Sequence, residues 1–240
     1  MPGDALRVAL VGARGRLGTA VARACRDDGH HVLAAGPGGD LPLREGADLV
    51  VDAAPAAATG HTVAQCRAAG LPLLSCASGL TPGHLDALRD LAAERPVLRA
   101  ANLTLGHWLQ RRTVALLAHT LAGHTDRPEA AVHERHTTAK RDSPSASALA
   151  LAELWTDRTG EPPAELASLR SGLPVSEHTF RLTFDHQTLT IHHDVRSLAA
   201  AAAGALLAVR WLARARPGLW SMDDVYDDAA RRSRHVDPYG

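Results

Sequence analysis

The chain is 240 residues long, enough for one large domain or for two modest domains that each bury a core. Its 26 basic and 26 acidic residues balance, so nucleic acid and anionic membranes are not its expected partners. Three cysteines without a CxxC pair argue against a disulfide framework or structural zinc, and they favour the cytoplasm. The N-terminal sequence lacks a secretory signal pattern, and the longest apolar stretch, 198–209, is shorter than the roughly 20 residues that span a bilayer.

The first hundred residues alternate short runs rich in Val and Leu with longer helical patterns. This rhythm is typical of β-α-β units on a parallel sheet, so it predicts a doubly wound α/β domain. Each predicted helix has an apolar face that can rest on the sheet. The expected strands are 7–11, 31–35, 49–52, 71–75 and 96–99, and the expected helices are 16–28, 59–69 and 82–93.

After Asn102 the pattern becomes that of an α+β domain with a mixed or antiparallel sheet. The last apolar helix ends at Arg216-Pro217-Gly218, which is a helix stop. We expect one domain at 1–103, completed by 205–240, and a second at 104–204. The expected helices are 105–122, 144–158 and 198–215, the strands are 129–134, 179–183 and 188–192 within the stretch 169–193, and the polar end 231–240 is expected to fray.

A glycine-rich turn, Gly12-Ala13-Arg14-Gly15-Arg16-Leu17-Gly18, follows the first strand and opens the first helix. Glycines here let the backbone approach a pyrophosphate, which the helix start attracts. The second strand ends without the acidic residue that usually binds the ribose hydroxyls. Arg14 and Arg16 instead favour the 2′-phosphate of NADPH over NADH. A glycine-rich turn without a ligand is the alternative.

Short loops of small residues follow the third and fourth strands, at Asp52-Ala53-Ala54-Pro55 and Cys76-Ala77-Ser78-Gly79. Ligands of open α/β sheets lie beyond the carboxyl ends of the strands, so these loops are candidates to line a nicotinamide pocket. Ordinary loop turns explain the same residues equally well.

The segment from His133 to Ser147 carries the strongest chemical signal. It contains His136 and the single lysine of the chain, Lys140, and all other basic residues are arginine. An ammonium can donate in a confined site where a planar guanidinium cannot replace it. Ser143 is the predicted N-cap and Pro144 the first helical residue, so the amides of 145–147 are expected to point out of a helix start that binds carboxylate. A bare helix cap beside a lysine placed by chance is the alternative.

Two other kinds of site are not indicated. The spacings of His133 with His136, and of His192 with His193, match no zinc pattern, so no metal is expected. A serine hydrolase would need a GxSxG-type elbow after a strand, and the sequence has none.

Four motifs in order, from about Arg7 to Asp228, resemble the 4-hydroxy-tetrahydrodipicolinate reductase family, also called dihydrodipicolinate reductase. The glycine turn is similar to its GxxGRMG loop. Segments 170–179 and 217–225 resemble its R-A-G-x-x-V-G-E-H-T and P-G-L-Y-x-M-x-D-V-L motifs. Its signature E-x-H-H-x-x-K-x-D-A-P-S-G-T-A is followed by Glu134, His136, Lys140, Asp142, Pro144, Ser145 and Ala148.

The resemblance implies a Rossmann-like domain, a second domain for substrate binding and oligomerisation, and a homotetramer built through the sheet of that second domain. It also implies an NAD(P)H-dependent reductase that delivers hydride to the C=N–C=C system of a cyclic, carboxylated substrate. In that family the residue matching His136 is the proposed acid-base group, and the one matching Lys140 assists protonation and substrate binding. Hydride transfer leaves negative charge on a conjugated atom, which a proton donor and a fixed cation stabilise.

The same resemblance places the remaining contacts. Cofactor contacts are expected at Gly12, Arg14, Gly15, Arg16, Leu17, Asp52, Ala53, Ala54, Cys76, Ala77, Ser78, Ala100 and Asn102. Substrate contacts are expected at Thr137, Lys140, Ser145, Ala146 and Ser147.

The chain departs from the family where a dicarboxylate would bind. Thr137 stands at the second histidine of the signature, Ala146-Ser147 replaces Gly-Thr, and Leu198 aligns with a substrate-contacting arginine. An unpaired buried carboxylate costs several kcal/mol, so the loss of that arginine should select against a dicarboxylate unless Arg196 or Arg170 takes its place. In the cofactor half, Ala53 lacks the aromatic ring of the family.

The sequence therefore predicts a divergent reductase that acts on an imine, enamine or other conjugated C=C/C=N compound in a specialised biosynthetic pathway. Three alternatives stay open. They are the orthodox reductase of lysine and diaminopimelate biosynthesis, an amino-acid dehydrogenase with the same nucleotide fold, and a catalytically silent scaffold that keeps the old pocket.

Overall fold

The computed structural model describes residues 5–42, 46–125, 127–172 and 175–233. The chain forms two compact units, Met1–Leu103 with Ala199–Gly240, and Thr104–Leu198. It returns to the first unit at Ala199, the first residue of α6 (Ala199–Leu212), whereas the sequence suggested residue 205. The whole helix belongs to the first unit because it packs along α1 (Arg16–Asp27).

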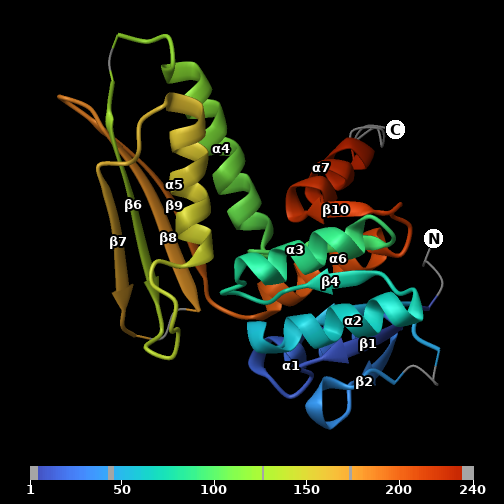
Figure 1. The fold of residues 1–240 in the computed structure, drawn as a ribbon. Helices are drawn as coiled ribbons and strands as arrows, with labels where there is room; N and C mark the ends of the chain where they lie inside the picture. Colours follow the sequence, from blue (N-terminus) through green and yellow to red (C-terminus); the bar gives the residue numbers. More distant parts are fainter. Residues whose placement is uncertain (1–4, 43–45, 126, 173–174, 234–240) are drawn as a thin grey trace, which may run out of the picture. The chain divides into compact units, whose positions relative to one another are not determined.

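In the first unit, the described strands form a six-stranded parallel sheet in the order β10-β5-β4-β3-β1-β2. Figure 1 shows α2 and α3 on one side of this sheet and α1 and α6 on the other. The doubly wound prediction is confirmed. The strands are β1 (Arg7–Val11), β2 (His31–Ala34), β3 (Leu49–Asp52), β4 (Leu73–Ser75), β5 (Pro96–Arg99) and β10 (Gly218–Ser221), and the remaining helices are α2 (Thr59–Ala69), α3 (Pro82–Ala92) and α7 (Met222–Ser233).

Strand β1 lies between β2 and β3, although β2 comes next in the chain. The chain therefore leaves β1 in one direction along the sheet and later continues in the other. At such a reversal, α/β proteins bind ligands beyond the carboxyl ends of the two diverging strands, at the loops that follow them. Here those are the loops after β1 and β3, which the sequence analysis had selected.

In the second unit, the described strands form a four-stranded sheet in the order β7-β6-β8-β9, with α4 and α5 on one face (Figure 1). Only the β6–β7 pair is parallel among these strands, so the sheet is mixed, as expected. Its core lies between sheet and helices and includes Trp155 and Phe180, whose ring centres are 5.3 Å apart. The elements are α4 (Leu105–Leu121), β6 (Glu129–His136), α5 (Ala146–Thr159), β7 (Glu165–Arg170), β8 (Ser176–Thr183) and β9 (Thr188–Val195).

Several predicted boundaries were wrong. Strand β6 continues to His136, because its pairing with β7 extends to His136 and its pairing with β8 extends to Arg135. Helix α5 begins at Ala146 rather than Pro144, because the hydroxyl of Ser145, not that of Ser143, accepts a hydrogen bond from the amide of Ala148. Strands β7 and β10 and helix α7 were not predicted, and the expected frayed end 231–240 is helical to Ser233, with 234–240 outside the described residues.

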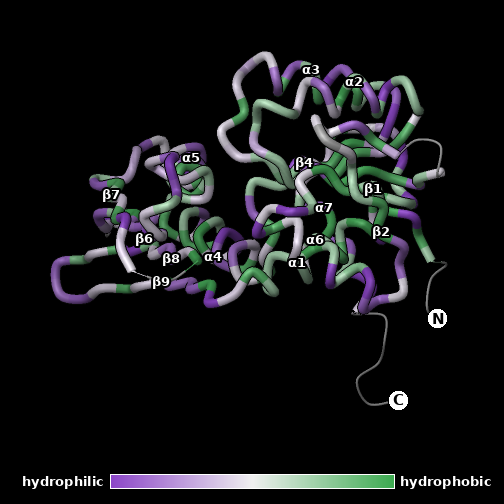
Figure 2. Tube along the Cα trace, turned by 90° about the horizontal axis from the view of Figure 1, so that it is seen from below, coloured by the Kyte–Doolittle hydropathy of each residue, from purple (hydrophilic) through white to green (hydrophobic). Residues whose placement is uncertain are grey.

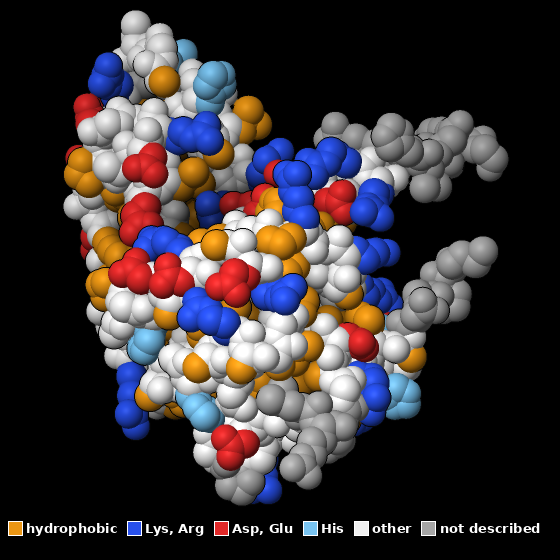
Figure 3. Space-filling model, turned by 45° about the vertical axis from the view of Figure 1, so that its right-hand side comes forward, with side chains coloured by type: hydrophobic (Ala, Val, Ile, Leu, Met, Phe, Trp, Pro, Cys, Tyr) orange, Lys and Arg blue, Asp and Glu red, His pale blue; other side chains and the backbone are white. Residues whose placement is uncertain are grey.

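The hydrophobic parts of the trace in Figure 2 run through β1 and β4 and the helices beside them. In the described ranges no helix is both long and apolar enough to cross a membrane. On the face shown in Figure 3, basic and acidic side chains are interspersed.

Candidate active site

The glycine turn after β1 is tightly closed. The amide of Gly15 donates to the carbonyl of Gly12, at 2.9 Å, and Gly12 has a φ of +77°. A Cβ atom on Gly12 would lie 2.7 Å from the carbonyl carbon of Ala53, and one on Gly18 would lie 2.1 Å from the carbonyl oxygen of Gly12. The turn therefore requires glycine, and it brings the loop after β1 against the loop after β3.

The start of α1 carries no internal anion. Its N-cap is Gly15, which has no side chain to cap the helix, and its first turn contains no acidic residue. Arg14 and Arg16 have exposed side chains and form no ion pair with another described residue. Free amides with two cations beside them suit a phosphate group, so this turn fits the pyrophosphate of a dinucleotide.

The other predicted cofactor residues lie in the same unit, in loops that follow β3, β4 and β5. Backbone hydrogen bonds link these loops: Ala53 donates to Val11, Cys76 to Asp52, and Ala100 to Ser75. The structure thus places these loops together at the carboxyl edge of the sheet. Leu17, the second residue of α1, follows the adjoining glycine turn. The gathered loop residues are Asp52, Ala53, Ala54, Cys76, Ala77, Ser78, Ala100 and Asn102.

Asp52 is the charged group of this edge. It is fully buried, Oδ1 accepts a hydrogen bond from the Ala54 amide at 3.0 Å, and Oδ2 has no hydrogen-bond partner among the described residues. Burial raises its pKa to about 6, against the smaller opposing effect of the Ala54 amide. Burial also raises the pKa of the Cys76 thiol to about 12, so this cysteine is not a thiolate nucleophile at neutral pH.

In the second unit the central group is Glu134 on β6, whose side chain is fully buried. Its Oε1 accepts three hydrogen bonds, from the Ser145 amide at 2.9 Å, the Ser168 hydroxyl at 2.7 Å and Arg170 at 2.8 Å. Burial pushes the pKa of Glu134 up, but the hydrogen bonds from Ser145, Arg170 and Ser168 outweigh it and hold the pKa at about 2. Glu134 is therefore a carboxylate throughout the physiological range.

His136, the predicted acid-base residue, is the last residue of β6 and is buried. Its Nδ1 atom lies 2.8 Å from Oε2 of Glu134. Burial lowers the pKa of His136, the Glu134 charge raises it, and the nearby Lys140 and Arg170 lower it again. The net effect is a lowered pKa, so the protonated ring is a stronger acid than an ordinary imidazolium.

Three further histidines belong to the same cluster: His178 lies next to His136, and His107 and His193 lie next to His178. The ring of His178 is 5.2 Å away, that of His107 is 5.8 Å from His178, and that of His193 is 6.4 Å from His178. Burial lowers the pKa of His107 and of His178 to about 3, and it lowers that of His193. These three rings are therefore neutral at pH 7. Nε2 of His178 lies 3.2 Å from the Ser145 hydroxyl. Of the four rings, His136 is the one that lies within 3 Å of a carboxylate.

Lys140 lies in the loop between β6 and α5. Its ammonium pairs with Oδ1 of Asp142 at 2.8 Å, and its backbone amide donates to the Thr137 carbonyl. The side chain is 24% exposed, so the ammonium is accessible while held in place. The structure therefore brings the two predicted catalytic residues into one unit and one strand-loop segment.

The predicted carboxylate-binding amides are arranged differently from expectation. The Ser145 amide is engaged by Glu134, and Ser145 and Ser147 are both buried. Neither arginine considered as a replacement carboxylate partner is free, because Arg170 is bound to Glu134 and Arg196 to Asp194. Thr137 and Leu198 are half-buried residues of the same unit, and Ala146 opens α5.

Sequence reasoning named Glu134 and His178 as motif matches without a role, considered Arg170 only as a replacement partner for a substrate carboxylate, and missed Ser168. The alternation of β6 already places Glu134 and His136 on one face of the strand, two residues apart. That signal could have identified Glu134 as a partner of His136. Arg170 is 36 residues away in the chain, and no local pattern connects it to Glu134.

Glu134, His136 and His178 also bring ligand-type atoms within 4.8 Å of one another, an arrangement that the sequence analysis did not foresee. The carboxylate already accepts three donors, one of which is the cationic Arg170. A further cation would be repelled by that guanidinium and by Lys140 nearby, so we assign this cluster to proton chemistry.

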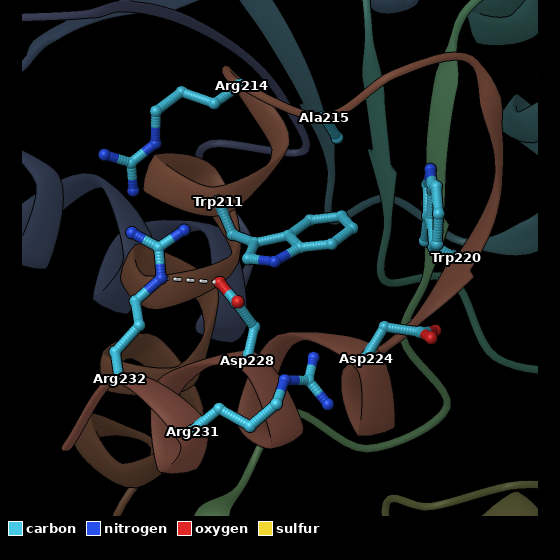
Figure 4. Close-up of a pocket in the computed structure, with 8 residues that line it drawn as sticks. All are labelled: Trp211, Arg214, Ala215, Trp220, Asp224, Asp228, Arg231 and Arg232. Carbon is cyan, nitrogen blue, oxygen red and sulfur yellow. Dashed lines mark hydrogen bonds and ion pairs between the residues drawn. The ribbon is translucent and has the colours of Figure 1, made fainter. Parts of the chain in front are cut away.

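A separate pocket of about 230 Å³ lies at α6, β10 and α7 (Figure 4). The indoles of Trp211 and Trp220 meet edge to face, 5.3 Å apart, beside the ion pair of Arg232 with Asp228. None of the predicted cofactor residues lines it. It is smaller than ordinary ligand pockets, which begin near 300 Å³, and it is not the expected nucleotide site.

Comparison with known proteins agrees with this architecture. Residues 108–226 match the family described as dihydrodipicolinate reductase, C-terminus. The 4-hydroxy-tetrahydrodipicolinate reductase of Alkalilimnicola ehrlichii is 31% identical over 264 residues, covering 91% of this chain and 98% of that protein. That of Thermomicrobium roseum is 34% identical over 265 residues, covering 92% and 99%.

Two solved structures share the fold. Dipicolinate-bound dihydrodipicolinate reductase from Paenisporosarcina sp. TG-14 has a TM-score of 0.70 at 17% identity, over 90% of this chain and 97% of that one. GenD2 from gentamicin A biosynthesis, in complex with NAD, has a TM-score of 0.60 at 15% identity, over 98% and 96%.

Fold, glycine turn and relatives together define the class of this protein as an oxidoreductase with a dinucleotide-binding type of domain. Within that class, the chain belongs to the 4-hydroxy-tetrahydrodipicolinate reductase family.

Proposed function

We propose that this protein is an NAD(P)H-dependent reductase that transfers hydride to a conjugated C=N/C=C bond of a small molecule. The observation that carries the proposal is the buried pair of His136 with the permanently ionised Glu134, next to the loop of Lys140. A buried imidazole beside a carboxylate can hold a proton at a defined atom, as general acid catalysis requires, and packing of the core alone does not require such a pair.

A dinucleotide would be held by the amides of the Gly12–Gly15 turn, by Arg14 and Arg16, and by the loops after β3 and β4. When bound, a reduced nicotinamide supplies the hydride. Arg14 and Arg16 support a preference for NADPH, because β2 ends at Ala34 without a carboxylate that would accept ribose hydroxyls. Comparing the affinities of NADPH and NADH tests this preference.

The chain's own residues supply position, charge and a proton. His136 in its protonated form donates a proton to the substrate atom that gains electrons, and its lowered pKa makes the donation easier. Lys140 fixes the negatively charged part of the substrate and stabilises the charge that develops. His136→Ala and Lys140→Ala should each reduce kcat by about 10²- to 10⁴-fold.

This experiment separates the enzyme from a silent scaffold. Both variants are compared with the wild type for dinucleotide affinity, for folding by circular dichroism and for turnover of a panel of cyclic imines. Retained affinity with lost turnover supports the reductase. A wild type that binds dinucleotide but turns over no imine, enamine or amino acid in the panel would contradict it.

We propose further that the substrate differs from the dicarboxylate of ordinary family members. Support comes from Leu198 at the arginine position and from the engagement of Arg170 and the Ser145 amide by the buried Glu134, while Arg196 pairs with Asp194 at the surface. An assay with 4-hydroxy-tetrahydrodipicolinate beside analogues with one carboxylate, at saturating NADPH, tests this proposal. Turnover of the dicarboxylate as efficient as in ordinary members would support the orthodox function, which identities of 31% and 34% to reductases of that name favour.

Finally, we propose assembly as a homotetramer through the sheet of the second unit. The face opposite α4 and α5 carries half-buried or exposed residues such as Ala131, His133, Thr179 and Arg181, in a mixed sheet with alternating burial. Light scattering coupled to size exclusion measures the mass directly. A charge placed centrally, Ala131→Glu, should shift the mass toward smaller species, and a wild-type monomer at micromolar concentration would contradict the proposal.

A further inference from the structure

Arg170, the last residue of β7, contacts two separate parts of the proposed site. One guanidinium nitrogen, Nη2, donates to Oε1 of Glu134 at 2.8 Å and also to the backbone carbonyl of Asp142. The side chain is 18% exposed, and its Nη1 donates to the Leu169 carbonyl at 3.0 Å. Arg170 is therefore held by three acceptors from three segments of the second unit.

Each main contact of Arg170 leads to one proposed catalytic residue. Glu134 lies 2.8 Å from His136, and Asp142 lies 2.8 Å from Lys140. The loop 137–145 between those residues has no regular secondary structure, so its position depends on such side-chain contacts. Arg170 is the side chain that joins the loop bearing Lys140 to the strand bearing His136.

We propose that Arg170 is a positioning residue, which fixes the distance between Lys140 and His136 by binding Glu134 and the Asp142 carbonyl at once. The inference rests on the proposed function and deepens it. It assigns to Arg170 an internal role rather than that of a substrate carboxylate anchor. A guanidinium suits this role because its planar fork presents several donors in a fixed geometry, which an ammonium cannot do.

The charges around His136 make the role measurable. The groups that face its ring are Glu134, Lys140, Arg170, Asp142 and the neutral His178. Among these, Arg170 lowers the pKa of His136 and Glu134 raises it. Removing Arg170 should therefore raise the pKa of His136, and removing the charge of Glu134 should lower it. A general loosening of the fold would not produce two opposite shifts.

The experiment uses the full-length protein with three variants, Arg170→Met, Arg170→Lys and Glu134→Gln. Arg135→Met is the matched control, because Arg135 also pairs with a glutamate of the same sheet, Glu177, but lies on the opposite face of β6. Histidine labelled with ¹³C at Cε1 gives the pKa of His136 by NMR, with the signal assigned from its loss in His136→Asn. Because Lys140 is the single lysine of the chain, reductive ¹³C-methylation gives one side-chain signal for the loop, with the α-amino group as reference.

We expect Arg170→Met to raise the pKa of His136, to narrow the Lys140 methyl signal as the loop loosens, and to lower kcat by about 10²-fold with little change in KM. Arg170→Lys keeps the charge but loses the double contact, so it should leave the pKa near that of the wild type while kcat still falls by about 10-fold. Glu134→Gln should lower the pKa of His136. Arg135→Met should change none of these.

Two outcomes overturn the inference. One is wild-type kcat and an unchanged Lys140 signal in Arg170→Lys, and the other is a higher KM with unchanged kcat in Arg170→Met, which would make Arg170 a substrate anchor. If Arg170→Met does not fold, Arg170→Lys decides by the same criteria. If the wild type turns over no substrate, the proposed function fails, whereas the pKa of His136 and the Lys140 signal still test the positioning role.

Discussion

Each unit buries a carboxyl group, Asp52 in the first and Glu134 in the second, and the pKa values of the two groups are shifted in opposite directions. Asp52, in the first unit, has one hydrogen-bond donor on Oδ1, and its pKa is raised to about 6. Glu134, in the second unit, has three donors on Oε1, and its pKa is lowered to about 2. Both side chains are buried, and the number and charge of their partners set the direction in which each pKa moves.

This contrast reflects how each unit handles charge. The first unit presents the backbone amides of the glycine turn, with Arg14 and Arg16, which pair with no other described residue, to a ligand that carries negative charge. The carboxyl group of its buried Asp52 accepts one hydrogen bond, from the Ala54 amide. The second unit pairs its charges internally, Glu134 with Arg170 and Asp142 with Lys140. We expect the first unit to be completed by a dinucleotide and the second to keep a rigid acid-base geometry without any ligand.

The largest effect is expected for Glu134→Gln, in the free energy of unfolding. Loss of the charge leaves Arg170 without its buried partner, and breaking such a pair costs about 3–5 kcal/mol. The wild-type carboxylate has a folded pKa of about 2, below the 4.5 of an ordinary glutamate, so its contribution is complete above pH 4.5 and disappears as the pH falls toward 2. Urea unfolding at pH 7 and pH 3 measures both effects.

Arg135→Met is the control for this measurement, because its partly exposed ion pair with Glu177 is screened by solvent and should contribute much less than the buried pair. A loss in Glu134→Gln no larger than in the control would mean that Glu134 is not stabilised by its three donors.

Asp52→Asn should have the opposite sign. The folded pKa of Asp52, about 6, lies above the 3.8 of an ordinary aspartate, so the ionised group destabilises the fold increasingly as the pH rises from 3.8 through 6. The amide removes that charge and keeps an oxygen for the Ala54 amide, so the apoprotein should gain up to about 3 kcal/mol at pH 7. The gain should vanish near pH 4, as urea unfolding at both pH values will show.

The exposed Asp27→Asn, which loses a surface pair with Arg23, is the matched control and should change stability by less than about 1 kcal/mol at either pH. Destabilisation by Asp52→Asn at pH 7 would show that Asp52 has a partner that compensates its charge.

The same contrast explains what could be predicted from the sequence. The first unit uses the backbone, and the backbone leaves local marks: a glycine at φ +77°, a glycine that excludes a Cβ, and strand ends followed by small residues. The second unit uses side chains that meet across the sheet. Arg170 reaches Glu134 over 36 positions through a parallel β6–β7 pair, and β7 itself was not predicted, because its burial does not alternate clearly.

The start of α5 illustrates the same limit at one residue. Ser143-Pro144 has the local pattern of an N-cap and first helical position, and the prediction followed it. Tertiary contacts select Ser145 instead, because its amide binds Glu134 and its hydroxyl lies 3.2 Å from Nε2 of His178. A local propensity cannot anticipate a cap that is chosen by two distant side chains.

Gly12→Ala tests whether the first unit depends on backbone geometry. The added Cβ would lie 2.7 Å from the Ala53 carbonyl carbon, at a positive φ that alanine adopts with strain, so unfolding should become easier by about 1–3 kcal/mol. Dinucleotide affinity should fall as well, as isothermal titration calorimetry will measure. Gly60→Ala, in α2 with open space around a Cβ, should lose neither stability nor affinity. If the two variants had the same stability and the same dinucleotide affinity, the tight turn would not be part of the binding site.

The smallest expected effect concerns the unpaired cations of the first unit. Arg14→Met and Arg16→Met should each weaken NADPH binding by about 2- to 5-fold, since exposed ion pairs contribute up to about 1 kcal/mol. NADH binding should be nearly unchanged, because it lacks the 2′-phosphate, and the loss with NADPH should shrink as salt screens the charges. Arg23→Met is the control, since Arg23 lies on the same helix and pairs with Asp27 at 3.5 Å. Equal losses for NADPH and NADH would assign the two arginines to the pyrophosphate, and no loss for either would leave the free amides of α1 as the anion site by themselves.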